Sequence, residues 1–82
     1  MDPMITFTLR GKTFEKRKDD FVKAVKGLEP GRIQKYSAQV GGKRYPIRQV
    51  LAAVTKLKAI AITSQDAYRV LEKFGFDVDA DE

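Results

Sequence analysis

Apolar and polar residues alternate with a period of two at residues 5–9, a pattern typical of a β-strand with one buried face. The turn Arg10-Gly11-Lys12 follows, and residues 13–16 can return as a second short strand. The run Lys16-Arg17-Lys18 would oppose the dipole of a helix in its first turn, whereas Asp19-Asp20 would complement it. A first helix is therefore predicted to begin at the end of this basic run, near Lys18.

This first helix has an apolar face and an end signal. Pro30-Gly31 is predicted to terminate it, because proline interrupts a helix and glycine favours the turn beyond it. The residues of its apolar face are Phe21, Val22, Val25 and Leu28.

A second hairpin is predicted from residues 35–40 and 43–45, which flank Gly41-Gly42. Two glycines readily adopt the positive φ angles that a two-residue hairpin turn requires. The hairpin passes without a linker into a second helix, and Pro46 can occupy its first turn because no hydrogen bond is lost there. Apolar residues at i, i+3, i+4 and i+7 give this helix one buried face: Ile47, Val50, Leu51 and Val54.

The third predicted helix has signals at both ends. Thr63 or Ser64 caps its start, and Thr63 and Asp66 have the spacing of a capping box. Gly75 fits the left-handed position beyond its C-terminus, and Phe76 follows where a Schellman motif places a hydrophobic contact. Its apolar stripe consists of Ala67, Val70, Leu71 and Phe74.

Two shorter segments and a faint repeat complete the pattern. Residues 57–62 form an apolar connection whose extended or irregular character stays open, and residues 76–79 alternate like a last short strand. Gly11 aligns with Gly42 and Phe14 with Tyr45, which suggests two hairpin–helix units, although chance explains this similarity equally well. The expected fold is α+β, with short antiparallel strands and three helices, and a winged-helix-like arrangement is one option.

The chain has 82 residues, 43% of them hydrophobic and 33% charged, which indicates one soluble domain spanning residues 1–82. Residues 1–4 are interpreted as a cloning remnant ahead of a native start at Met4, and residues 79–82 as an acidic tail. No apolar run reaches the roughly 18–20 residues that span a membrane, and a secretory signal is absent. A cytoplasmic location without a membrane partner is therefore expected.

The chain contains no cysteine and no histidine, which excludes disulfides, thiolate or imidazole metal sites, and triads that use either residue. Asp19 and Asp20 form a carboxylate pair, but adjacent helical residues do not face each other. Gly41-Gly42-Lys43 lacks the glycine spacing of a phosphate-binding loop, and Arg44 stands where that loop needs Ser or Thr. We therefore expect no catalytic residue, metal, cofactor or enzymatic activity.

The net charge of +5 is unevenly distributed. Asp77, Asp79, Asp81 and Glu82 lie in the last six residues, so residues 1–76 carry 16 Lys and Arg against 7 Asp and Glu, a balance of +9. This basic body favours an anionic partner, although a lysine-rich surface also serves solubility. The acidic end is expected to be solvated, and competition with an anionic partner is the alternative.

Candidate binding residues cluster where the second hairpin meets its helix. Lys43, Arg44 and Arg48 would hold phosphates there, because the start of a helix attracts anions. Arg48 and Gln49 lie early enough in the helix to reach guanine and adenine edges, and a solvated helix face is the alternative. The run Lys16-Arg17-Lys18 would add nonspecific attraction.

Tyrosines are interleaved with these basic residues. A tyrosine such as Tyr36 or Tyr45 can stack on a base or contact a phosphate. Packing in the core is the favoured interpretation for Tyr45, which takes the place of Phe14 in the repeat. Tyr68 is expected to pack its ring at the margin of the third helix, with its hydroxyl in water.

Several motifs resemble a known pattern: Gly42-Lys43-Arg44-Tyr45-Pro46, Val50, Ser64, Ala67, Leu71 and Gly75-Phe76-x-Val78. Over residues 35–78 they are similar to G-x-x-YP-x-K, a helix, S-x-x-A-x-x-x-L and L-G-F-x-V. This pattern occurs in small bacterial proteins and in N-terminal domains of McrA-like, modification-dependent restriction endonucleases. The chain has Arg48 where the pattern has Lys, and Phe74 where it often has Leu. The resemblance implies a winged-helix-like DNA-binding module, without nuclease residues and without a defined preference for modified bases.

The sequence therefore favours a non-enzymatic nucleic-acid-binding module, with double-stranded DNA preferred over RNA as the partner. The alternative is a small protein-interaction adaptor of bacterial or phage origin, whose basic charge serves solubility.

Overall fold

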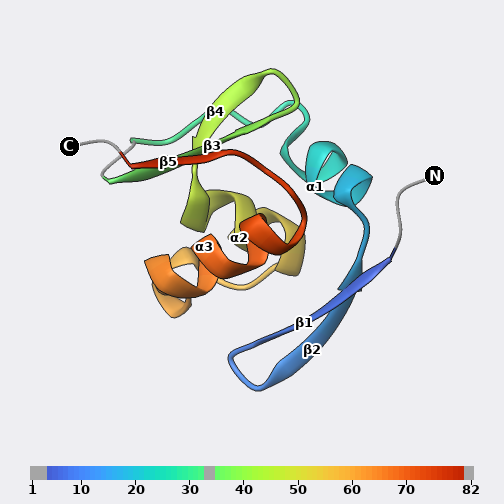
Figure 1. Cartoon of the computed structure of the whole chain (residues 1–82). Coiled ribbons are helices and arrows are strands. Elements are labelled where there is room, and N and C mark those ends of the chain that lie inside the picture. Colours follow the sequence, from blue (N-terminus) through green and yellow to red (C-terminus); the bar gives the residue numbers. More distant parts are fainter. Residues whose placement is uncertain (1–3, 33–34, 81–82) are drawn as a thin grey trace.

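The computed structural model describes residues 4–32 and 35–80 of the chain (Figure 1). Two hairpins each precede a helix, and a third helix and a last strand follow. The elements are β1 (Ile5–Leu9), β2 (Lys12–Lys16), α1 (Lys18–Val25), β3 (Tyr36–Val40), β4 (Lys43–Pro46), α2 (Ile47–Thr55), the 3-10 turn η1 (Ala59–Ala61), α3 (Ser64–Lys73) and β5 (Val78–Ala80).

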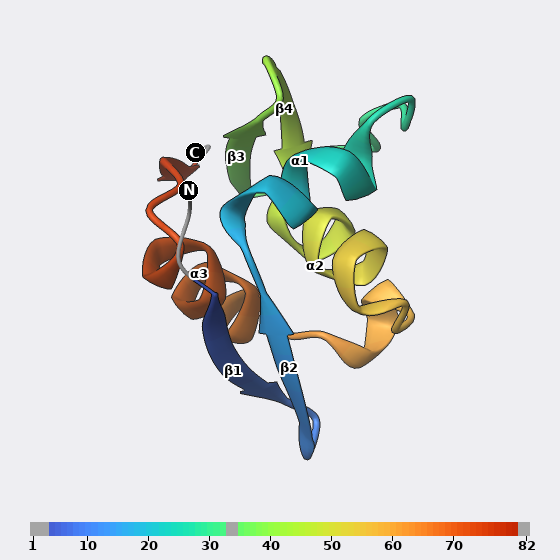
Figure 2. The ribbon, with the colours of Figure 1, turned by 90° about the vertical axis from the view of Figure 1, so that its right-hand side faces the viewer.

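The described strands form two antiparallel sheets. β1 pairs with β2, with Phe7 opposite Phe14, and β3 lies between β4 and β5, with Ala38 opposite both Tyr45 and Val78. In Figure 1 the three-stranded sheet lies above α2 and α3, and Figure 2 shows the turns of the two hairpins at opposite ends of the molecule. The α+β fold expected from the sequence is confirmed.

Both hairpins close through two residues with positive φ angles. These angles are 54° at Arg10 and 78° at Gly11 in the first turn, and 63° at Gly41 and 88° at Gly42 in the second. Such turns match the natural twist of paired strands. The strands of both hairpins begin or end within one residue of the predicted positions, and the two hairpin–helix units are present.

Helix α1 begins at Lys18, as predicted. The backbone N–H of Arg17, just before the helix, donates to the Asp20 carboxylate at 2.7 Å. The N–H of Asp20 in turn donates to the carbonyl of Arg17 at 3.0 Å. This reciprocal contact explains why an acidic residue occupies the third helical position, because helix starts carry N–H groups that need acceptors.

The end of α1 differs from the prediction. The helix stops at Val25, well before Pro30-Gly31, because Gly27 adopts a φ of 80° and turns the chain. Leu28 therefore lies outside the helix, where its N–H donates to the carbonyl of Val25 at 2.9 Å. The hydroxyl of the buried Tyr45 lies 3.2 Å from the carbonyls of Val25 and Leu28 and donates to this end of the helix. Tyr45 is thus a packing residue, as predicted.

Helix α2 begins at Ile47, whereas the sequence placed Pro46 in its first turn. Pro46 is the last residue of β4 and the cap of α2, with extended φ and ψ angles of −57° and 135°. The hairpin and the helix therefore join without an intervening residue.

Helix α3 has the two ends that the sequence predicts. The Thr63 hydroxyl accepts a hydrogen bond from the N–H of Asp66 at 3.1 Å. Gly75 adopts a φ of 82°, and the N–H of Phe76 donates to the carbonyl of Leu71 at 3.0 Å. This hydrogen bond defines a Schellman motif, so the predicted end of the helix is confirmed.

Two short segments remain, residues 57–62 and the last strand. Residues 57–62 contain η1 rather than a strand, and Ile60 is 85% exposed while Ile62 is buried. The last strand begins at Val78, because Phe76 turns into the core and so leaves β5 to pair with β3 only from Val78 onward.

Five phenylalanines form the centre of the core. The fully buried ring of Phe21 lies 4.5 Å from Phe74, 5.4 Å from Phe76 and 6.5 Å from Phe7, between ring centroids. Phe14 stacks on Phe7 at 5.4 Å. The cluster therefore joins the first hairpin and α1 to α3 and the segment before β5.

The left-handed conformation of Gly75 gives a first prediction. Gly75→Ala should lower the free energy of unfolding by about 1 kcal/mol, because a Cβ strains a residue at positive φ. A Cβ there would meet only the Lys18 Nζ at 4.0 Å, so the cost comes from the backbone rather than from a clash. Urea denaturation measures the change, and Gln65→Ala on the exposed surface of α3 is the control. Equal midpoints for Gly75→Ala and the wild type would contradict this account of the helix end.

Candidate functional site

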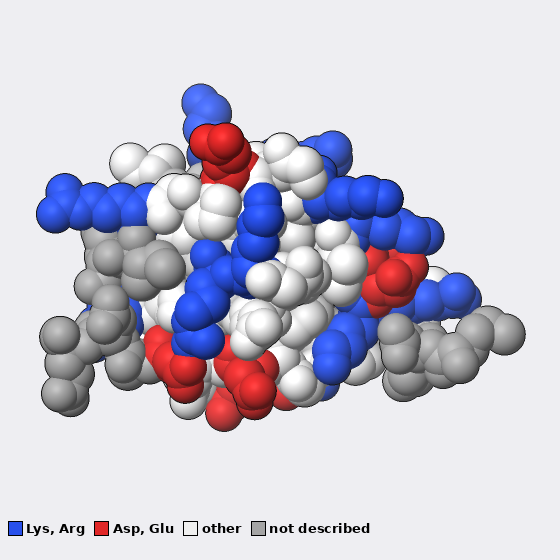
Figure 3. Space-filling model, turned by 90° about the horizontal axis from the view of Figure 1, so that it is seen from above, with Lys and Arg blue, Asp and Glu red and all other residues white. Residues whose placement is uncertain are grey.

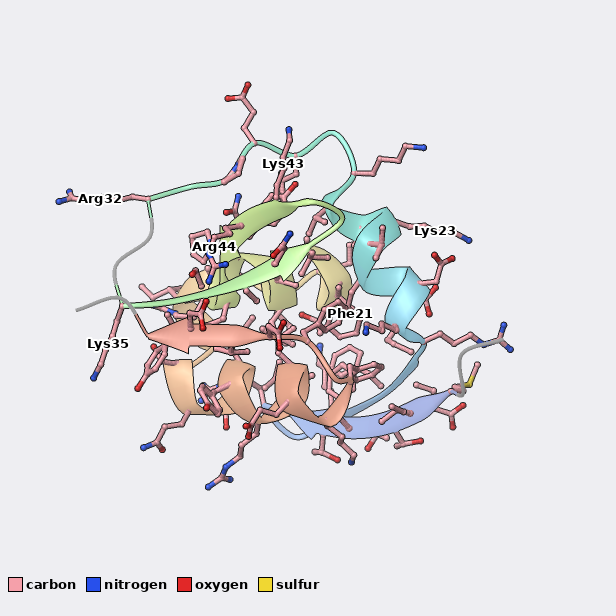
Figure 4. The ribbon with its side chains drawn as sticks, turned by 45° about the horizontal axis from the view of Figure 1, so that its top comes forward. Phe21, Lys23, Arg32, Lys35, Lys43 and Arg44 are labelled. Atoms are coloured by element: carbon pink, nitrogen blue, oxygen red, sulfur yellow. The ribbon has the colours of Figure 1, made fainter. Side chains whose placement is uncertain are left out.

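Exposed cations, with acidic side chains among them, lie on the side of the molecule that carries the β3–β4 hairpin (Figure 3). We define the basic face by five of them: Lys23, Arg32, Lys35, Lys43 and Arg44. In Figure 4 the side chains of Lys23, Arg32, Lys35 and Lys43 extend away from the body of the protein. They come from α1, the loop before β3 and the start of β4, so the fold collects charges that are scattered along the sequence.

Lys43 and Arg44 lie on this face as the sequence predicts, but they differ in their contacts. Lys43 directly follows the hairpin turn and is exposed. Arg44 forms an ion pair with Asp79 and donates from Nε to the hydroxyl of Ser37 at 3.3 Å. Asp79 belongs to β5 and reaches the basic face through this ion pair, and the acidic tail expected over residues 79–82 stays a prediction. Asp81 and Glu82 lie outside the described residues.

Arg48 points into the protein. Its Nε donates to the carbonyl of Ile62 at 2.8 Å and to that of Ala59 at 3.3 Å, and its Nη2 donates to Ala59 at 2.9 Å. The side chain is half-buried and joins the first turn of α2 to η1. The Arg48 side chain is therefore not fully solvent-facing as expected, because the chain around η1 brings two backbone carbonyls to its guanidinium. Its contact with phosphates stays a prediction.

Gln49 also makes internal contacts. Its Oε1 accepts from the N–H of Gly31 at 2.7 Å, and its Nε2 donates to the carbonyl of Glu29 at 3.0 Å. A Cβ at Gly31 would lie 3.3 Å from this oxygen, so glycine permits the close approach. Both ends of the Gln49 amide thus hold the loop that carries Arg32, and reading of a base by this amide stays a prediction.

The run Lys16-Arg17-Lys18 lies at the junction of β2 and α1, in the other hairpin–helix unit from Lys43. Lys18 Nζ lies 5.1 Å from the centroid of the Phe76 ring, just beyond the C-terminus of α3. A cation stabilises that end of a helix and the face of an aromatic ring. These contacts give Lys18 a structural role, and the contribution of the run to binding stays a prediction.

Two adjoining cavities beside α2 and α3 were missed by the sequence analysis. One of about 300 Å³ lies at the first turn of α2 and is bordered by Arg32, Lys35 and Arg48. The other, of about 290 Å³, lies at the first turn of α3 and is bordered by Tyr68 and Arg69. In the sequence, a basic and an aromatic residue are adjacent at Lys35-Tyr36 and again at Tyr68-Arg69. The spacing between these two dipeptides does not predict that they line adjoining cavities.

Comparison with models of protein families assigns the chain to a family. The model of a family described as SCO5918-like matches residues 9–82, which include every described element except most of β1. The chain belongs to the SCO5918-like family. This match gives no link to McrA-like restriction endonucleases. No curated protein and no solved structure was found to match the chain.

The basic face and the two cavities of this SCO5918-like domain present cations, tyrosines and amides. Among residues 4–32 and 35–80, no three His, Cys, Asp or Glu side chains are placed together to hold a metal ion. No helix in the same described part is long and apolar enough to cross a membrane. The arrangement offers charge for anions and ring surface for planar groups.

The internal role of Gln49 gives a second prediction. Gln49→Ala should lower the free energy of unfolding by about 1–2 kcal/mol, because two hydrogen bonds to the loop before β3 are lost. Urea denaturation measures this change. Gln65→Ala, which removes an exposed glutamine from α3, should have an effect within about 0.5 kcal/mol of zero. If both variants were as stable as the wild type, the loop would not depend on the Gln49 amide.

Proposed function

We propose that this SCO5918-like protein is a non-enzymatic nucleic-acid-binding module that contacts the phosphates of double-stranded DNA through the basic face. The observation that carries the proposal is the gathering of cations from separate elements on one side of the fold (Figures 3 and 4). Phosphate contacts supply most of the affinity of such modules. A cytoplasmic location, expected from the sequence, fits this role.

Much of the positive charge on this face is available to an anionic partner. The chain has 16 Lys and Arg against 11 Asp and Glu, and two ion pairs occur within the described residues, Lys23–Asp19 and Arg44–Asp79. The four side chains of these pairs are between 42% and 74% exposed. Exposed ion pairs contribute little stability, so a phosphate can replace the carboxylate at small cost.

The proposed mode of binding relies on charge rather than on base reading. Arg48 and Gln49, the two residues expected to reach base edges, have their polar groups engaged by backbone atoms. Phosphate contacts position a protein on DNA without selecting a sequence. We therefore propose weak sequence preference for the duplex. A winged-helix-like mode of binding and the resemblance to McrA-like N-terminal domains stay predictions.

A protein-interaction adaptor is the second candidate function. The observation in its favour is the exposure of Ile60 on η1, which is 85% accessible. Exposed apolar side chains occur singly on many protein surfaces, so one isoleucine is a small basis for an interface. Replacing Ile60 by Ser should leave DNA binding unchanged under the first proposal.

The repeat provides a matched pair of variants for a third prediction. Lys43 and Lys12 each follow the glycine of a two-residue hairpin turn and are exposed, but their turns lie at opposite ends of the molecule (Figure 2). Lys43→Ala should weaken duplex binding about three- to tenfold at low salt and reduce the slope of log affinity against log salt by about 0.9. Lys12→Ala should leave both quantities near their wild-type values. Fluorescence anisotropy with a labelled duplex across a salt series measures both.

Two outcomes would contradict the proposed function. One is no binding of the duplex by the wild type even at low salt, which would favour the adaptor. The other is equal loss of affinity in Lys43→Ala and Lys12→Ala, which would show attraction by net charge without a defined face.

A further inference from the structure

The two cavities beside α2 and α3 form one groove, because Tyr36 and Ser64 line both of them. The volumes are about 300 Å³ and about 290 Å³, and pockets for small ligands begin at roughly 300 Å³. We call this feature the tyrosine groove. The residues that line it include Arg32, Lys35, Tyr36, Ser64, Tyr68 and Arg69.

Two aromatic rings from different elements meet in the groove. Tyr36 comes from the start of β3 and Tyr68 from α3, and their ring centroids lie 5.6 Å apart at an angle of 73°. Both side chains are half-buried and line the groove, so part of each tyrosine remains accessible from it. Partly open rings of this kind are the surface on which nucleic-acid bases stack.

Cations border both parts of the groove. Arg32 and Lys35 border the groove on the side of α2, and Arg69 borders it on the side of α3. Lys35 Nζ lies 5.3 Å from the centroid of the Tyr36 ring. Arg32 and Lys35 also belong to the basic face, so the groove begins where that face ends.

We propose that the tyrosine groove binds unpaired nucleotides that continue from a duplex held on the basic face. The bases would stack on Tyr36 and Tyr68, and the phosphates would contact Lys35 and Arg69. Combined aromatic and cationic contacts of this kind bind single strands without reading sequence. Paired bases inside a duplex do not present their faces, so this binding requires an unpaired strand. The inference rests on the proposed binding of duplex DNA and adds a class of preferred substrate, a duplex with a single-stranded end.

An acidic peptide is the competing occupant. It would satisfy Arg32, Lys35 and Arg69, but its carboxylates make no use of the two rings. Nucleotides have planar bases that stack on the rings, whereas the carboxylates of a peptide do not. Probes with and without bases therefore distinguish the two ligands.

The test compares three labelled probes by fluorescence anisotropy at one salt concentration. They are a blunt duplex, the same duplex with a short thymidine overhang, and the same duplex with an abasic overhang of equal phosphate count. The thymidine overhang should bind at least about fivefold more tightly than the abasic overhang, because base stacking adds to the shared charge. The blunt duplex should also bind, through the basic face alone.

Variants assign the gain to the groove. Tyr68→Leu should abolish the advantage of thymidine over abasic overhangs and leave the blunt duplex unaffected, whereas Tyr68→Phe should keep that advantage. Thermal unfolding checks that both variants fold. Arg69→Ala changes an exposed residue, so its folding is not at issue, and it should weaken binding of both overhangs relative to the blunt duplex.

The outcomes separate the inference from the function on which it rests. Binding of the blunt duplex with equal affinities for thymidine and abasic overhangs would overturn the groove as a base site and leave the proposed function intact. A thymidine advantage that survives in folded Tyr68→Leu, together with unchanged overhang binding in Arg69→Ala, would place the bases elsewhere and overturn the inference. No binding of any probe would overturn both proposals.

Discussion

Burial of the Phe21 ring is the interaction on which the rest of the structure depends. Phe21, labelled in Figure 4, belongs to α1 and is fully buried. Its ring lies against Phe7 of β1, Phe74 at the end of α3 and Phe76 before β5. One side chain therefore connects the first hairpin–helix unit to the last helix and strand. Removal of a buried phenylalanine ring costs about 3–5 kcal/mol, a large share of the stability of a domain of this size.

Contacts at the end of α1 position the loop that carries Arg32, which belongs to both the basic face and the tyrosine groove. The Tyr45 hydroxyl contacts the end of α1, and the Gln49 amide holds the loop that follows it. That loop carries Arg32 to the side of α2, where it meets Lys35 at the start of the next hairpin. Gln49 of α2 and Tyr45 of β4 thus hold the loop in place, and the exposed charges of the basic face come from α1, the loop and the hairpin.

Local features were predictable from the sequence, whereas contacts between distant segments were not. The cap at Thr63, the left-handed Gly75 and the start of α1 depend on residues within a few positions of each other. The end of α1 was misplaced because Pro30-Gly31 is a stronger stop signal than Gly27, which acts first. The internal contacts of Arg48 and Gln49 were not predicted because their partners are backbone groups 11 to 20 residues away, and periodicity carries no information about such contacts. The tyrosine groove was missed for the same reason, since β3 and α3 each supply one ring.

The central claim is that nucleic acid occupies the basic face, and the most direct measurement is an amide chemical-shift map of the folded protein during titration with a short DNA duplex. The account predicts that the largest shifts occur at Lys43, Arg44, Arg32 and Lys35, with little change at the Arg10-Gly11 turn at the opposite end. Shifts concentrated at that turn or around Ile60, or no shifts at low salt, would contradict it.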